Sequence, residues 1–249
     1  MFDVQSFHVF LADLEHLYAG LSVAEPPSFS FRDYVLAVEE RRSSPAWQEA
    51  QAWWQRRLET IAPPPDLPLA VAPTSLQWPR FRRHARTMEP QAWSVLGRRA
   101  AERGLTGSAV LLTAFSEVLA QWARSPHFTV NLTHFNRERM HPDVMKLVGD
   151  FTSVLLVTAD CSRNLNFTAQ VQHLQKEMWA GLAHRMYSGV DVMRDVSRLS
   201  GTMDAGRMPV VFTSLLGLDI DHLADTGREG ALLGEPICLE TATPQVWLD

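Results

Sequence analysis

The stretch at residues 128–157 constrains the fold more than any other part of the sequence. Apolar and polar residues alternate from residue 128 to residue 133, the two-residue period of a half-buried strand. A charged turn that contains a proline follows at residues 137–143, and an apolar run at residues 154–157 predicts a second, buried strand. Because rigid scaffolds usually present functional groups on loops, this polar loop between two strands predicts the mouth of a site.

The sequence around this stretch predicts helices that cover a sheet. The strongest helix is expected at residues 106–123, followed by helices at 167–185 and 191–199. Strands that are separated by helices favour an α/β architecture. Side chains of the strongest helix and strand are expected in the core, namely Val110, Leu111, Phe115, Val118, Leu119, Trp122, Val154 and Leu156.

Weaker signals predict three further elements nearer the N-terminus. Apolar residues recur at helical spacing in the first 21 residues, where Ser6 is placed to cap a helix. Ser30 and Asp33 predict a capping box that opens a second helix. After a proline-rich crossing that begins at Pro63, residues 81–88 are expected to form a strand.

Composition excludes several classes of protein. The chain of 249 residues carries 23 basic and 28 acidic residues, a net charge of -5, which argues against a nucleic-acid partner. The absence of a signal peptide, and of an apolar run long enough to span a bilayer, argues against a membrane location. Cys161 and Cys238 are expected to be free thiols of a cytoplasmic protein, and no histidine spacing predicts a metal site.

Three segments resemble the motifs of one known family. NLTHFNRERMHPDVMKLVGDFTSVLLV, PVVFTS and TPQVWLD resemble the motifs of heterocyclization domains of nonribosomal peptide synthetases, in the order found in that family. The segment LTGSAVLLTAFSEVLAQWAR resembles a further motif, with Gly107 at a position where proline is common. The resemblance covers the whole chain and identifies it as a member of the condensation-domain superfamily.

The resemblance implies a fold like that of chloramphenicol acetyltransferase, an α/β sandwich of two lobes with the site in a tunnel between them. Residues 1–75 would be the end of the first lobe, and residues 76–249 most of the second. The family has a D-x-x-x-x-D-x-x-S motif, and only its second aspartate and its serine are matched, by Asp3 and Ser6. The family also continues beyond the position of Asp249 with a strand and a helix. We therefore expect a fragment that is truncated at both ends and cannot complete heterocyclization alone.

The implied function is heterocyclization on carrier-bound substrates, as in siderophore assembly. A cysteine, serine or threonine on one carrier protein condenses with an upstream acyl thioester, and cyclodehydration gives a thiazoline or an oxazoline. Partners would be upstream and downstream peptidyl carrier proteins and a neighbouring adenylation domain, with no directly bound cofactor beyond the carriers' phosphopantetheine arms. Two alternatives remain: a catalytically silent lobe that docks carrier proteins, and an ordinary amide-forming condensation domain.

The resemblance also implies which residues form the site. Thr213 and Asp249 match the threonine and aspartate that the family uses in cyclodehydration, although residues of these types at strand ends are otherwise usually caps. Gln245, Asn131 and Asn136 are expected to bind the substrate together with Asp3. For the three amides, buried side chains that satisfy backbone groups are an equally good interpretation.

Overall fold

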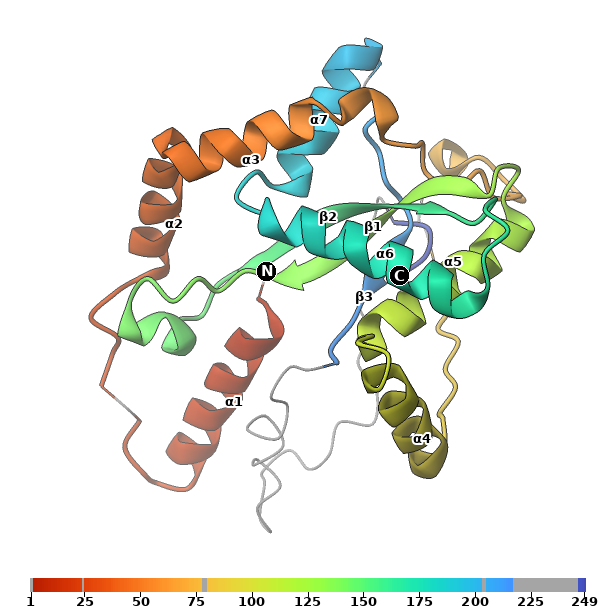
Figure 1. Cartoon of the computed structure of the whole chain (residues 1–249). Coiled ribbons are helices and arrows are strands. Elements are labelled where there is room, and N and C mark those ends of the chain that lie inside the picture. Colours follow the sequence, from red (N-terminus) through yellow and green to blue (C-terminus); the bar gives the residue numbers. More distant parts are fainter. Residues whose placement is uncertain (1, 24, 78–79, 203–204, 217–245) are drawn as a thin grey trace. The chain divides into compact units, whose positions relative to one another are not determined.

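The computed structural model describes residues 2–23, 25–77, 80–202, 205–216 and 246–249 (Figure 1). The described residues form two compact units. The first unit contains residues up to 48 together with 134–153, and the second contains residues 49–133, 154–216 and 246–249. Each unit is made of segments that alternate along the chain, whereas the two expected lobes are consecutive. The boundary between the lobes at residue 75 stays a prediction.

The described chain is a mixture of helices and strands, as expected for an α/β protein (Figure 1). The α-helices are α1 (Val4–Tyr18), α2 (Phe31–Glu40), α3 (Pro45–Gln55), α4 (Pro90–Ala101), α5 (Gly107–Trp122), α6 (Phe167–Ala183) and α7 (Gly189–Ser200). The strands are β1 (His127–Phe135), β2 (Thr152–Asp160) and β3 (Val211–Thr213). Short 3-10 helices occur at η1 (Arg41–Ser43), η2 (Leu58–Thr60), η3 (Pro73–Ser75) and η4 (Pro142–Lys146). None of the described helices is both long and apolar enough to cross a bilayer.

The first unit is built around a small aromatic and aliphatic core. Its buried members are Tyr34, Val144, Leu147 and Phe151. The predicted capping box is present, and it begins α2 by pairing the side chain and backbone of Ser30 with those of Asp33. At Gly149 a Cβ atom would lie 2.3 Å from the ring of Phe31, so the loop approaches α2 as closely as only glycine permits.

The second unit is a three-stranded sheet with helices packed on it. The strand order is β2-β1-β3, and β1 runs parallel to β3. Helix α6 lies directly on β2, because a Cβ atom at Gly181 would meet the side chain of Leu155 at 2.9 Å. Helix α5 packs in turn against α6. The core of this unit is mainly apolar, with Phe128, Val130, Leu155, Leu174 and Val210 almost completely buried.

Helix α5 buries a different face from the one that its large apolar residues predict. Val110 and Leu119 are buried as expected, and so is Leu156 of β2, while Leu111, Phe115 and Val154 are partly buried. Val118 and Trp122, however, are 60% and 67% exposed. The helix instead buries small residues, namely Ala109, Thr113 and Ser116 beside Leu112. Small side chains allow a helix to approach its neighbours closely, and the amphipathic pattern alone does not reveal this preference.

Two predictions of local structure in the N-terminal half of the chain are wrong. Residues 81–88 form no strand, and Phe81 and Met88 at its ends are 46% and 49% exposed, so no core face holds this segment. Helix α1 is capped by Asp3 and not by Ser6, because the Asp3 carboxylate accepts the Ser6 N–H at 2.8 Å. Ser6 itself is a buried residue of the first helical turn.

Candidate functional site

Thr213 and Asp249, which are 36 positions apart, are brought together at one edge of the sheet. Thr213 ends β3, and a parallel bridge joins Val210 to Leu248 beside that strand. The Val211 N–H donates to the Leu248 carbonyl at 2.8 Å, which holds the last residues against β3. As a result the Thr213 hydroxyl donates to the Asp249 Oδ1 atom at 3.0 Å, with both residues exposed.

A second threonine joins this pair. Thr133 of β1 is the cross-strand partner of Thr213 in the parallel register. The Thr213 and Thr133 Oγ1 atoms are 3.2 Å apart, so the three side chains form a continuous hydrogen-bonded row. Thr133 is not among the residues that the sequence motifs predict for the site. The available signal was its position two residues after Asn131, because strand alternation puts both side chains on one face.

Asn131 lies deeper on the same face of β1 as Thr133. Its backbone N–H donates to the Val210 carbonyl at 3.0 Å, and the residue is 8% exposed. Its side-chain Oδ1 atom is buried and has no hydrogen-bond partner among the described residues. A buried amide oxygen without a partner is costly, and such an atom is therefore available to accept a hydrogen bond from a further donor.

Asn136 belongs to the first unit, where its backbone forms hydrogen bonds with neighbouring elements. Its N–H donates to the Phe151 carbonyl at 2.9 Å, and its carbonyl accepts the Tyr34 hydroxyl at 2.5 Å. Burial raises the pKa of Tyr34 above its usual value. The phenol is therefore a stable neutral donor in this loop.

Asp3 forms the most enclosed polar cluster of the first unit. Arg137 donates from Nε to Asp3 Oδ2 and from Nη2 to Oδ1, both at 2.7 Å, and the side chains are 6% and 0% exposed. The Ser6 hydroxyl lies 2.6 Å from Asp3 Oδ1 and accepts the Gly149 N–H at 2.9 Å. Burial alone would raise the pKa of Asp3, but the hydrogen bonds from Arg137 and Ser6 outweigh it and hold that pKa below its usual value.

The same arginine ties the loop that follows β1 to the start of the chain. Arg137 also donates to the backbone carbonyls of Val144 and Leu147, at 2.8 and 3.0 Å. Its guanidinium stacks over the Phe151 ring, 3.9 Å from the ring centroid. The polar turn that the sequence places at the mouth of a site is therefore held by ion pairing and hydrogen bonds.

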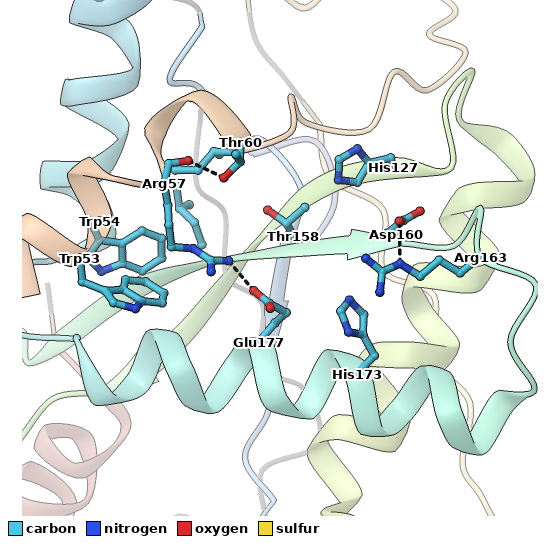
Figure 2. Close-up of a pocket in the computed structure, with 12 residues that line it drawn as sticks. Trp53, Trp54, Arg57, Thr60, His127, Thr158, Asp160, Arg163, His173 and Glu177 are labelled. Carbon is cyan, nitrogen blue, oxygen red and sulfur yellow. Dashed lines mark hydrogen bonds and ion pairs between the residues drawn. The ribbon is translucent and has the colours of Figure 1, made fainter.

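A separate hollow of about 270 Å³ lies in the second unit (Figure 2). Figure 2 shows two ion pairs on its walls, Arg57 with Glu177 and Arg163 with Asp160. Each cation is neutralised by its carboxylate, and none of the predicted site residues lines this hollow. Its walls come from segments that are far apart in the chain.

Two remaining expectations concern Gln245 and metal binding. Gln245 lies outside the described residues. Among the residues that the structure describes, no group of three or more histidine, cysteine, aspartate or glutamate side chains is arranged to hold a metal ion.

Comparison with known sequences relates the chain to large synthetases. A family model described as the condensation domain matches residues 1–215. Pyochelin synthetase PchF of Pseudomonas aeruginosa is 38% identical over 248 residues, which are 99% of this chain and 13% of that protein. Phenyloxazoline synthase MbtB of Mycobacterium tuberculosis is 37% identical over 251 residues, 99% of this chain and 17% of that protein. The chain thus spans a small part of the length of either relative.

Comparison with solved structures gives the same relationship for the fold. The monoclinic crystal form of the EpoB NRPS cyclization-docking bidomain from Sorangium cellulosum has a TM-score of 0.77 and 37% identity, covering 87% of this chain and 44% of that one. The nonribosomal peptide synthetase FmoA3 has a TM-score of 0.81 and 31% identity, covering 98% of this chain and 25% of that one. The mixed α/β structure therefore matches the fold of these synthetase domains.

Proposed function

Because this chain belongs to the condensation-domain family, we propose that it serves heterocyclization in nonribosomal peptide synthesis. The observation that carries this proposal is the contact between Thr213 and Asp249, at 3.0 Å, in the two motifs that resemble those of heterocyclization domains. The similarity to a phenyloxazoline synthase and to a cyclization domain supports the same conclusion.

The proposed reaction has two stages. The amine of a carrier-bound cysteine, serine or threonine attacks an acyl thioester, which forms an amide and releases the upstream carrier's thiol. The side-chain sulfur or oxygen of the same residue then attacks the new amide carbonyl carbon and gives a tetrahedral hydroxyl-bearing intermediate. Loss of that hydroxyl with a proton releases water and leaves the carbon–nitrogen double bond of a thiazoline or an oxazoline.

The Thr213–Asp249 pair fits the needs of the second stage. Water leaves only if a proton reaches the departing hydroxyl and another is removed from nitrogen, which is general acid–base chemistry. A carboxyl group can both give and accept a proton, and a hydroxyl hydrogen-bonded to it can orient the intermediate. Both groups are exposed, so a substrate can reach them.

Substrate binding is assigned to the neighbouring amides. Asn131 supports this role with a buried side-chain oxygen that has no partner among the described residues and lies on the same strand face as Thr133. Gln245 and Asn136 are proposed on their match to the family motifs alone. The Asp3 side chain has no exposed surface, so its proposed contribution is to hold the loop through Arg137 and not to touch the substrate.

The substrates would arrive on partner proteins. We assign delivery to two peptidyl carrier proteins, each presenting its substrate on a phosphopantetheine arm, with an adenylation domain loading the downstream carrier. The family relationship supports this assignment, because the relatives that match are multidomain synthetases of which this chain covers 13% and 17%.

The test is a single substitution in the full-length protein, assayed with carrier-bound acyl donor and carrier-bound cysteine, serine or threonine. We expect Asp249→Asn to leave amide formation intact and to slow ring closure by about a hundredfold or more. Mass spectrometry of the carrier-bound product distinguishes the outcomes, because the cyclized product is one water lighter than the linear amide.

The matched control is Asp66→Asn, which changes an exposed aspartate of the same unit paired with Arg124. This variant is expected to cyclize like the wild type. Normal cyclization by Asp249→Asn would remove the role given to Asp249. A wild-type protein that makes only the linear amide would favour a condensation domain, and one that makes neither product would favour a silent docking lobe.

A further inference from the structure

We propose that Thr133 is a positioning residue for ring closure, whose hydroxyl orients the Thr213 hydroxyl toward Asp249. The inference rests on the proposed function and assigns to the same site a third residue, which the resemblance does not identify. It is carried by the hydrogen-bonded row of Thr133, Thr213 and Asp249, with oxygen–oxygen distances of 3.2 and 3.0 Å.

The backbone fixes the relation between the two threonines. Thr133 and Thr213 are register partners in the parallel pair of β1 and β3, so their side chains emerge on one face. Threonine has a β-branched side chain with few accessible rotamers in a strand. Two such side chains on neighbouring strands therefore keep their hydroxyls in contact without help from a flexible residue.

Counting protons shows why the third group is needed. Thr213 Oγ1 is the donor to both Thr133 Oγ1 and Asp249 Oδ1, and its single proton can serve only one of them at a time. Beside an ionised Asp249, which only accepts, that proton goes to the carboxylate. When Asp249 has taken up a proton, the carboxyl can donate to Thr213, and the Thr213 proton can turn to Thr133 Oγ1. Thr133 Oγ1 is thus the acceptor that holds the Thr213 proton whenever the carboxyl group does not take it.

The hydrogen-bonded row also restricts the orientation of the Thr213 hydroxyl during proton transfer. A hydroxyl with a free rotor spreads its proton over several orientations, whereas one held at both sides is limited to the two orientations that point to Asp249 or to Thr133. Thr133 is half-buried and, in the part of the chain that the structure describes, its hydroxyl is hydrogen-bonded to Thr213 alone. We therefore expect its hydroxyl to act through Thr213 and not on the substrate.

The experiment compares Thr133→Val with Thr133→Ser in the full-length protein with carrier-bound substrates. Valine keeps the shape and removes the hydroxyl, while serine keeps the hydroxyl. We expect Thr133→Val to slow ring closure about tenfold, the effect of one positioned hydrogen bond, with unchanged formation of the linear amide. Thr133→Ser is expected to cyclize within about threefold of the wild type. Mass spectrometry over time reports both steps in one reaction, and the linear amide should accumulate only in the valine variant.

Thr129→Val is the matched control. Thr129 lies on the same strand and makes a similar threonine pair, with Thr158 at 3.0 Å, but it is completely buried. Loss of the Thr129 hydroxyl in Thr129→Val is expected to lower thermal stability while leaving the ratio of cyclized to linear product unchanged.

Each outcome separates the inference from the proposed function. Ring closure at the wild-type rate in Thr133→Val overturns the role of Thr133 and leaves the function intact. Equal slowing of amide formation and ring closure shows a merely structural effect and also overturns it. A wild-type protein that forms no ring under these conditions overturns the proposed function and the inference with it.

Discussion

Arg137 and Asp3, which are 134 positions apart, form a two-pronged ion pair with both nitrogen–oxygen distances at 2.7 Å. The two side chains are 6% and 0% exposed. Asp3 also caps α1, and Arg137 also binds two carbonyls of the loop that follows β1. One buried pair thus joins the first helix to the loop in which most of the family-like motif lies.

Removing Arg137 should destabilise the protein severely. Arg137→Met keeps an apolar stem but leaves the Asp3 carboxylate buried without its partner, which costs about 3 to 5 kcal/mol in free energy of unfolding. Urea denaturation monitored by circular dichroism measures the loss. The control is Arg163→Met, because the Arg163–Asp160 pair is 49% and 22% exposed and should contribute less than about 1 kcal/mol. Similar losses in the two variants would contradict the importance of burial.

Asp3 should make stability fall in acid. Its pKa in the folded protein lies below the ordinary value of 3.8, so the folded state binds fewer protons than the unfolded state. The resulting stabilisation is complete above the unfolded-state pKa and is lost as the pH falls through the lowered folded-state value. We expect wild type to lose more unfolding free energy than Asp3→Asn between about pH 7 and about pH 3.

Asparagine suits this comparison because it also caps helices well, so the variant removes the charge and keeps the N-cap. The difference in stability between wild type and Asp3→Asn should therefore shrink as the pH is lowered. A difference that stays constant over this range would show that the Asp3 charge does not contribute to stability.

Two helical glycines should respond oppositely to alanine. At Gly97 in α4 a new Cβ atom meets nothing within 4 Å, so Gly97→Ala should stabilise by about 0.5 to 1 kcal/mol through helix propensity. At Gly181 in α6 the new atom would lie 2.9 Å from Leu155, a buried residue of β2. Gly181→Ala should therefore destabilise by about 1 to 3 kcal/mol.

Thermal denaturation of both variants measures the contrast. Leu155→Val shortens the side chain that opposes the new Cβ atom. The double variant Gly181→Ala/Leu155→Val should therefore lose less unfolding free energy than the sum of the losses in the two single variants. Stabilisation by Gly181→Ala alone would mean that α6 does not rest closely on β2.

Local patterns in the sequence were sufficient for most of the regular elements. The helices at residues 106–123 and 167–185, and the strand that begins near Phe128, are formed as predicted, since their periodicity and caps act over a few residues. The strand expected at residues 81–88 did not form, for a reason that lies outside the segment. A strand needs a partner and a core to cover, and neither is encoded within these eight residues.

The motifs of the sequence by themselves determined the family, the α/β class and the candidates Thr213 and Asp249, because motif identity depends only on residue order. The tertiary structure alone decided which groups meet. The parallel register of β1 and β3 brought Thr133 to Thr213, and burial of both side chains joined Asp3 to Arg137. Such contacts join residues that are 80 and 134 positions apart, and their hydrogen-bond geometry depends on the packing of whole strands and helices. No local pattern contains that information, since each partner's own neighbours in the chain are the same whether or not the contact forms.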